Sequence, residues 1–225
     1  MDTLRQQFIE FALRVGVLRF GEFTTKAGRK SPYFFNTGLF DTGAKLGALA
    51  GFYARTLLEA RAAGRVRFDM LFGPAYKGIT LASATAVALA GLGHDVPFAF
   101  NRKEAKDHGE GGSLVGAPLK GRVVIVDDVV TNGAAKREAI ALLSNAGAEP
   151  AGVLIAFDRM ERAGPDDALS ARSAVQELET LHGLPVIAIA NLDDLLAFAN
   201  SSAPAAEQVR AYLPAMQSYR DHYGA

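Results

Sequence analysis

An unbroken apolar run that ends in two acids constrains the fold of this chain most. Residues 123–126 read Val-Val-Ile-Val, and Asp127 and Asp128 follow directly. Such a run is typical of a strand buried on both faces, as in a parallel sheet. Because ionised carboxylates are too costly to bury unpaired, we expect the acids at the strand end. Open α/β sheets bind ligands at this edge, so the run predicts a ligand site.

A turn of small residues follows the acids. Residues 131–135 read Thr-Asn-Gly-Ala-Ala, and a helical pattern then runs to about Asn145, with Gly147 as its stop. A helix that begins after such a turn is an anion site. Two acids beside an anion site would repel a simple anion. They fit a ligand that also carries hydroxyl groups, because carboxylates accept hydrogen bonds from hydroxyls and can contact hydrated Mg²⁺. The stretch therefore predicts a phosphorylated sugar, such as a ribose 5-phosphate.

Two other interpretations of this stretch stay open on its pattern alone: a Walker-B-like strand end, and a turn with solvated acids. The sequence contains neither G-x-x-x-x-G-K-[ST] nor G-x-G-x-x-G. A P-loop nucleoside triphosphatase and a dinucleotide-binding fingerprint are therefore not indicated.

Strands and helices are predicted to alternate from residue 41 onward. Expected strands are 68–72, 96–100, 123–126, 151–157 and 186–189; expected helices are 43–63, 79–90, 135–145, 173–182 and a short one from Asp193. This alternation predicts an α/β fold with a central parallel sheet flanked by helices. Before residue 41 we expect a helix over 4–15 and strands over 17–23 and 32–36. These first elements do not show the regular alternation of strands and helices. After Ser201 we expect one terminal helix, with Pro204 in its first turn.

Residues 101–119 are predicted to form a long loop. It opens with the basic or titratable residues Arg102, Lys103, Lys106 and His108, and glycines follow at 109, 111 and 112. Long loops in compact domains are usually functional or disordered, and glycines permit large backbone excursions. The composition alone fits equally a lid that closes over an anion and a solvated linker.

Composition excludes several classes of protein. The 225 residues suit one domain, and an apolar fraction of 49% is enough for a full core. Twenty-four basic and 24 acidic residues balance, which argues against nucleic-acid binding. The chain has no cysteine, so it can use no disulfide and no thiol chemistry. No signal-peptide core and no apolar run long enough for a bilayer occur, so we expect a cytoplasmic protein without membrane contact.

Four segments carry a resemblance to a known family. Residues 123–135 resemble the phosphoribosyl pyrophosphate (PRPP) motif of type I phosphoribosyltransferases. Residues 72–78, Phe-Gly-Pro-Ala-Tyr-Lys-Gly, resemble the pyrophosphate loop of that family. Residues 101–112 and 30–36 resemble the mobile catalytic loop and the orotate-side hairpin of orotate phosphoribosyltransferases. The resemblance covers about residues 1–215.

The resemblance implies a Rossmann-like type I phosphoribosyltransferase fold. Residues 1–40 would form a small base-binding hood, and residues 41–225 the core, with a mobile lid at about 101–119. The implied reaction joins orotate to PRPP, giving orotidine 5′-monophosphate and pyrophosphate in de novo pyrimidine biosynthesis. Mg²⁺ would be held mainly through PRPP and water, with no direct protein ligand. The implied assembly is a homodimer whose lid residues act partly across the interface.

The resemblance also implies residue roles on the PRPP side. Asp127 and Asp128 would hold the ribose hydroxyls, and Tyr76 and Lys77 would meet the pyrophosphate, with a cis bond expected between Ala75 and Tyr76. Lys106 and the two acids would be the catalytic residues. The 5-phosphate cradle would consist of Val129, Val130, Thr131, Asn132, Gly133, Ala134 and Ala135. The remaining PRPP contacts would come from Lys26, Arg102, Lys103, Lys106 and His108.

On the orotate side, the resemblance implies an apolar wall from Phe34 and Phe35, and a carboxylate contact from Arg159. Lys26 and Thr131 would also contact orotate. A planar arginine fork suits a carboxylate. Without the resemblance, Arg159 would be a surface residue and the two phenylalanines ordinary hairpin core. Lys26 would likewise be a solvated turn residue, and His108 would be a loop histidine without a role in binding or catalysis.

Two other functions compete with this reading. A purine or uracil salvage phosphoribosyltransferase would share the PRPP motif but lack Lys26, the Phe34–Phe35 pair and Arg159 as a set. A regulator that senses PRPP without turnover would need a nucleic-acid-binding segment, and residues 1–40 are neither strongly basic nor patterned as a helix-turn-helix.

Overall fold

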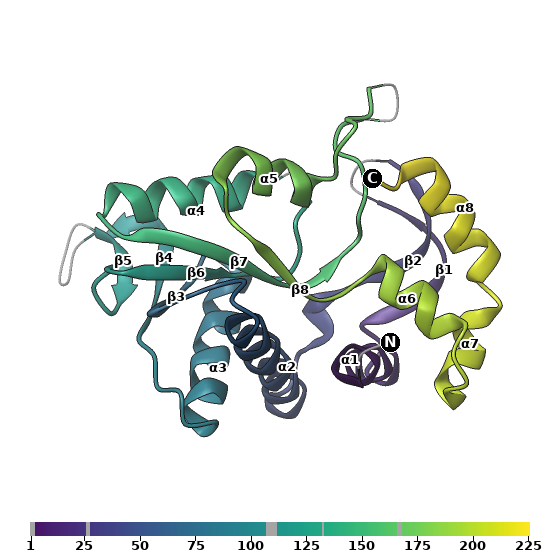
Figure 1. Cartoon of the computed structure of the whole chain (residues 1–225), viewed down its shortest axis with the longest axis horizontal. Coiled ribbons are helices and arrows are strands. Elements are labelled where there is room, and N and C mark those ends of the chain that lie inside the picture. Colours follow the sequence, from purple (N-terminus) through teal and green to yellow (C-terminus); the bar gives the residue numbers. More distant parts are fainter. Residues whose placement is uncertain (1–2, 26–27, 107–111, 132, 166–167) are drawn as a thin grey trace.

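A six-stranded, mostly parallel sheet forms the centre of the molecule in the computed structural model, which describes residues 3–25, 28–106, 112–131, 133–165 and 168–225 (Figure 1). The strand order is β5-β4-β3-β6-β7-β8, and only β5 runs antiparallel to its neighbour. The strands are β3 Met70–Gly73, β4 Phe98–Lys106, β5 Gly112–Gly116, β6 Arg122–Val126, β7 Glu149–Asp158 and β8 Val186–Asn191. The predicted α/β class is confirmed.

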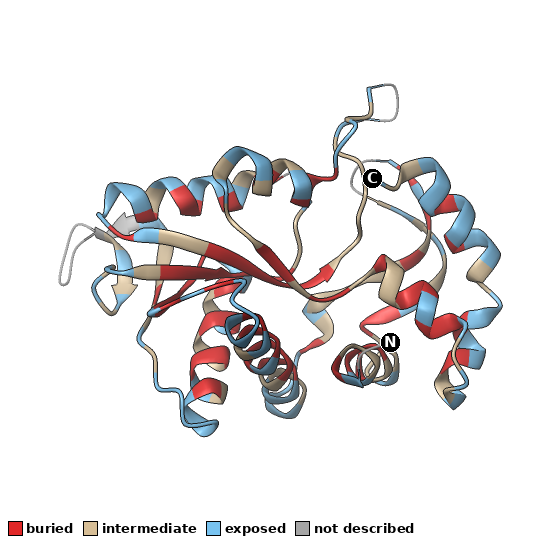
Figure 2. Cartoon of the chain, in the orientation of Figure 1, coloured by how far each residue is buried: buried red, intermediate tan, exposed pale blue. Residues whose placement is uncertain are grey.

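Helices cover both faces of the sheet. One face carries α1 Thr3–Arg14, α2 Gly43–Ala62 and α3 Lys77–Gly91; the other carries α4 Ala134–Asn145 and α5 Ala174–His182 (Figure 1). Strand β6 explains the apolar run, because Val124 and Val126 enter the core cluster under α2 and α3, whereas Val123 and Ile125 enter the cluster under α4. Figure 2 shows the resulting pattern of buried strands and outer helix faces open to solvent.

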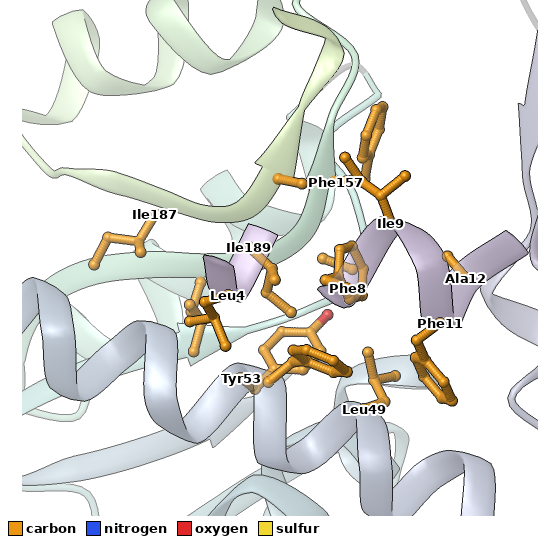
Figure 3. Close-up of a cluster of buried hydrophobic side chains, with 14 of the residues drawn as sticks. Leu4, Phe8, Ile9, Phe11, Ala12, Leu49, Tyr53, Phe157, Ile187 and Ile189 are labelled. Atoms are coloured by element: carbon orange, nitrogen blue, oxygen red, sulfur yellow. The ribbon is translucent and has the colours of Figure 1, made fainter. Parts of the chain in front are cut away.

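Helix α1 belongs to the larger of these two clusters. Its buried side chains Leu4, Phe8, Ile9, Phe11 and Ala12 lie against Leu49 and Tyr53 of α2 and reach Phe157 of β7 (Figure 3). Phe8 meets Phe52 edge-on at 5.4 Å between ring centres. The first helix is thus anchored on the sheet by aromatic packing.

Strands β1 Leu18–Thr24 and β2 Lys30–Phe35 form a separate antiparallel hairpin, followed by the 3₁₀ turn η1 Thr37–Leu39. The last part of the chain contains α6 Leu192–Ala199, η2 Pro204–Ala206, α7 Glu207–Arg210 and α8 Leu213–Tyr223. Pro204 does lie in a first turn, but the prediction of one terminal helix is wrong. Pro214 in the first turn of α8 lacks an N–H donor, so a new helix begins there.

The prediction of a loop from residue 101 is also wrong for residues 101–106 and 112–116. They continue β4 and form β5, an antiparallel pair at the sheet edge. The pairing of β4 with β3 ends at Phe100, so residues 101–106 pair with β5 alone and carry charged side chains such as Arg102 and Lys103. The charge pattern therefore resembled that of a loop. In the described part of the chain, no helix has the length and apolar character needed to cross a membrane.

Candidate active site

The two acids extend the ladder between β6 and β7. The Asp127 N–H donates to the Leu154 carbonyl at 3.0 Å, and Ala156 N–H donates to the Asp128 carbonyl at 2.8 Å. Both acids are buried, at 7% and 9% exposure. Buried carboxylates require partners, and each acid has a lysine.

Asp127 is paired with Lys136 of α4. The ammonium lies 2.5 Å from Asp127 Oδ2 and donates to the Val129 carbonyl at 2.6 Å, and the lysine is 5% exposed. Burial raises the pKa of Asp127, and Lys136 opposes that rise. The sequence prediction missed Lys136. A signal existed, because Lys136, Ile140 and Leu143 share one helical stripe, where a lysine is out of place unless paired.

Asp128 is held by Lys77 and Thr37. Its Oδ2 accepts from Lys77 Nζ at 2.6 Å and from Thr37 Oγ1 at 2.8 Å, and Lys77 also donates to Thr37 at 2.9 Å. Burial alone would raise the pKa of Asp128, but these donors outweigh it and lower the pKa below its usual 3.8. Lys77 and Asp128 were both predicted; Thr37 was not, because no motif marks it. Thr37 ties the segment after the hairpin to the acids.

The predicted pyrophosphate loop is a tight turn between β3 and α3. A Cβ on Gly73 would lie 2.1 Å from the Gly78 carbonyl oxygen, and one on Gly78 would lie 2.9 Å from that of Val126. Glycine is therefore required at both positions. The expected cis bond between Ala75 and Tyr76 is present. Asn101 Oδ1 accepts from Ala75 N–H at 2.9 Å and ties this turn to β4.

Two predicted basic residues lie beside this turn. Arg102 and Lys103 of β4 help to line a hollow of about 300 Å³, together with Pro74, Ala75, Asn101, Ala135 and Glu138. Lys103 Nζ lies 5.3 Å from the ring centre of Tyr76, which is 69% exposed. The hollow thus joins the turn between β3 and α3 to one side of α4, and two basic side chains and Glu138 face it.

The predicted phosphate cradle forms the link from β6 to α4. Gly133 is the N-cap residue of α4, and Ala134 and Ala135 are its first two residues. Val129 and Val130 are half-buried, and Thr131 is exposed. The turn is thus open at Thr131 and closed by apolar contacts at its start, as a backbone anion site requires.

On the hairpin, Phe34 and Phe35 point in opposite directions. Phe34 stacks on Phe23 at 5.4 Å, whereas Phe35 stacks on Phe157 of the core at 5.1 Å. Tyr33 shares the face of Phe35 and also meets Phe157, so it turns away from Phe34 as strand alternation predicts. The two phenylalanines therefore do not form one continuous wall of rings.

Arg159 directly follows β7, three positions beyond the residue bonded to Asp128. Its guanidinium donates to Glu161 and Ser31 and lies over the Tyr33 ring at 4.6 Å. Burial would lower its pKa, but Tyr33 and the Glu161 carboxylate outweigh burial and raise it. The reading of Arg159 as a plain surface residue is excluded, because its side chain is only 16% exposed.

Some predicted site residues lie outside the description. They are Lys26, His108, Asn132 and the side chain of Lys106. Among the described residues, no three His, Cys, Asp or Glu side chains gather as metal ligands.

Comparison with known proteins decides the family. Residues 45–179 match the phosphoribosyl transferase domain. Orotate phosphoribosyltransferase of Herminiimonas arsenicoxydans is 62% identical over 224 residues, covering 100% of this chain and 99% of that protein. The chain belongs to the orotate phosphoribosyltransferase family. Another orotate phosphoribosyltransferase, from Ralstonia nicotianae, is 62% identical and covers 99% of this chain and 96% of its own length.

A solved structure supports the same family. The crystal structure of orotate phosphoribosyltransferase from Francisella tularensis has a TM-score of 0.82 and 39% identity. It covers 97% of this chain and 100% of its own. The resemblance to orotate phosphoribosyltransferases and the type I fold inferred from the four segments are confirmed.

Proposed function

We propose that this chain transfers the ribose 5-phosphate group of PRPP to N1 of orotate, giving orotidine 5′-monophosphate and pyrophosphate for pyrimidine biosynthesis. The observation that carries this proposal is the meeting of three elements at one sheet edge. The acid pair after β6, Lys77 of the pyrophosphate loop and the turn into α4 share that edge. The orotate phosphoribosyltransferases of Herminiimonas arsenicoxydans and Ralstonia nicotianae match 100% and 99% of this chain.

On the PRPP side, Asp127 and Asp128 would accept hydrogen bonds from the ribose hydroxyls. The turn at 129–135 would receive the 5-phosphate through its backbone N–H groups. Lys77 and Tyr76 would meet the pyrophosphate. Lys77 Nζ lies 2.6 Å from Asp128 Oδ2, so its ammonium would lie between the ribose and the pyrophosphate of PRPP.

On the base side, Arg159 would bind the orotate carboxylate, and Lys26, Phe34, Phe35 and Thr131 would complete the pocket. The hydrogen bond from Thr37 to Asp128 supports this arrangement, because it places the segment after the hairpin beside the acids. The ring of orotate would then lie next to the sugar that it attacks.

The chemical step needs positioning and charge stabilisation. An oxocarbenium-like transition state at the anomeric carbon lets pyrophosphate leave, and negative charge builds on that group. Lys106, Arg102, Lys103 and His108 would stabilise this charge as the β4–β5 segment covers the site. The chain uses no nucleophile of its own.

Further proposals concern the surroundings of the enzyme. Both acids already contact lysines, so we propose that Mg²⁺ enters on the pyrophosphate of PRPP and meets the chain through water. When bound, it would neutralise phosphate charge. We propose a homodimer whose lid residues act partly across the interface. We also propose a cytoplasmic location.

One assay tests the proposed reaction. The protein is incubated with PRPP, Mg²⁺ and, in separate reactions, orotate, uracil, adenine or hypoxanthine, and pyrophosphate release is measured. We expect release with orotate alone. Turnover of a purine without turnover of orotate would indicate a salvage enzyme, and PRPP binding without turnover of any base would indicate a regulator.

A further inference from the structure

Glu161 holds Arg159 by one edge of its guanidinium. Glu161 Oε1 accepts from Arg159 Nε at 2.7 Å and lies 2.5 Å from Nη2. Nη2 also donates to Ser31 Oγ at 3.1 Å and to the Tyr219 hydroxyl at 3.4 Å. These contacts occupy the Nε–Nη2 edge of the planar group. Nη1 makes no hydrogen bond within the described part of the chain, and it belongs to the other edge of the fork.

Glu161 is itself held from two sides. The Tyr219 hydroxyl of α8 donates to Oε1 at 2.9 Å, and Arg29 Nη1 lies 3.5 Å from Oε2. Arg29 is 3% exposed and donates its Nη2 to the Arg162 and Gly164 carbonyls. The Glu161 carboxylate is therefore held by groups other than Arg159.

The neighbouring backbone is fixed by the last residues of the chain. Arg162 N–H donates to the Tyr223 carbonyl at 2.7 Å, and Ala225 N–H donates to the Met160 carbonyl at 3.0 Å. Tyr33 closes the remaining side, under the guanidinium. Three distant segments, β2, residues 159–164 and α8, thus meet around one arginine.

Arg159 therefore keeps one amino group, Nη1, outside its contacts with Glu161 and Ser31. A guanidinium N–H group is a strong donor to a carboxylate. We infer that Glu161 is a positioning residue that presents Nη1 of Arg159 to the carboxylate of the base and so sets selectivity for a carboxylated pyrimidine. This inference rests on the proposed role of Arg159.

The test is steady-state kinetics of Glu161→Gln with orotate and PRPP varied separately. Charge-assisted hydrogen bonds contribute more than neutral ones, so we expect KM for orotate to rise about tenfold. We expect KM for PRPP and kcat to change less than about threefold. Inhibition by uracil, the same ring without the carboxylate, should be unchanged. A lower KM for orotate would overturn the inference, because it would mean that Glu161 competes with substrate for Arg159.

Three further variants complete the test. Tyr219→Phe removes one hydroxyl bonded to Glu161, and KM for orotate should rise a few-fold even if Glu161→Gln folds poorly. Glu177→Gln, a partly buried glutamate on α5 that accepts from Ser170, is the matched control and should leave KM unchanged. Arg159→Lys separates the two levels of the hypothesis. If it leaves KM for orotate unchanged, the role of Arg159 is wrong; if only Glu161→Gln and Tyr219→Phe have no effect, the inference alone is wrong.

Discussion

Lys136 places its ammonium 2.5 Å from Asp127 Oδ2, and neither side chain is more than 10% exposed. The pair lies between the start of α4 and the end of β6, so it joins the phosphate turn to the acid motif. Removing one partner of a buried ion pair leaves an uncompensated charge, which typically costs about 3–5 kcal/mol. The pair therefore makes an ionised Asp127 possible in a buried position.

Lys136→Met should lower the free energy of unfolding by about 3–5 kcal/mol near neutral pH. Burial already raises the pKa of Asp127, and loss of the lysine will raise it further. A group with a raised folded pKa stabilises fully below its ordinary value of 3.8, and that contribution is lost as the pH rises through the folded value. The loss in urea unfolding should thus be larger at about pH 8 than at about pH 5.5.

Two controls accompany this variant. Lys120→Met removes an exposed lysine and should change stability by less than about 0.5 kcal/mol. Adding Asp127→Asn to Lys136→Met removes the stranded charge and should restore part of the stability. Equal destabilisation at both pH values would contradict the assigned pairing.

Thr37→Val should weaken PRPP use. The variant keeps the shape of the side chain but removes the donor to Asp128 and the acceptor of Lys77. We expect KM for PRPP to rise about tenfold, equivalent to about 1.4 kcal/mol. Because Thr37 helps to keep the pKa of Asp128 low, the acid limb of kcat/KM for PRPP should move to higher pH. Thr37→Ser retains the hydroxyl and should behave like the wild type; a Val variant with an unchanged acid limb would exclude this role.

Gly78→Ala should disturb the pyrophosphate loop. The new methyl group would lie 2.6 Å from Pro74 Cδ and 2.9 Å from the Val126 carbonyl oxygen, so the loop must shift. We expect a loss of about 1–3 kcal/mol in stability and weaker PRPP binding by calorimetry. Gly91→Ala, in the same helix, meets nothing within 4 Å and should be neutral or slightly stabilising. Normal PRPP binding by Gly78→Ala would show that the loop tolerates the shift.

Lys106→Ala should lower kcat far more than it weakens PRPP binding by the resting enzyme. The reason is that a lysine ammonium on a covering segment acts mainly on charge that builds in the transition state. Single-turnover kinetics and equilibrium binding of PRPP separate the two effects. An unchanged kcat would mean that the role belongs to another residue.

Much of the fold follows from local patterns. The apolar run at 123–126 predicted a strand buried on both faces. The structure confirms it, because alternate residues of β6 enter the two core clusters on opposite faces of the sheet. The β4–β5 pair was missed for a physical reason. Beyond Phe100, β4 no longer pairs with β3, and its residues 101–106 carry charged side chains in place of the apolar alternation that marks a strand.

The candidate site was predictable only where a motif carried it. Asp127, Asp128 and Lys77 follow from motif positions, and the structure brings Lys77 to Asp128. Thr37, Glu161 and Tyr219 could not be found this way. Their contacts join positions 58 to 91 residues apart in the chain, and no local periodicity encodes such distances. Lys136 lies between these cases, since a lysine in an apolar stripe signals a buried partner.

The contacts of Arg159 have a consequence for how specificity can change. The hairpin, residues 159–164 and α8 surround this arginine, whereas β3, β6 and the turn into α4 carry the residues proposed to bind the sugar phosphate. A new base preference could therefore arise by substitutions near the two ends of the chain while the middle keeps its donor substrate. Because the hairpin and α8 must fit each other around one guanidinium, such substitutions should succeed as matched sets, and exchanging either end alone between relatives should produce weak enzymes.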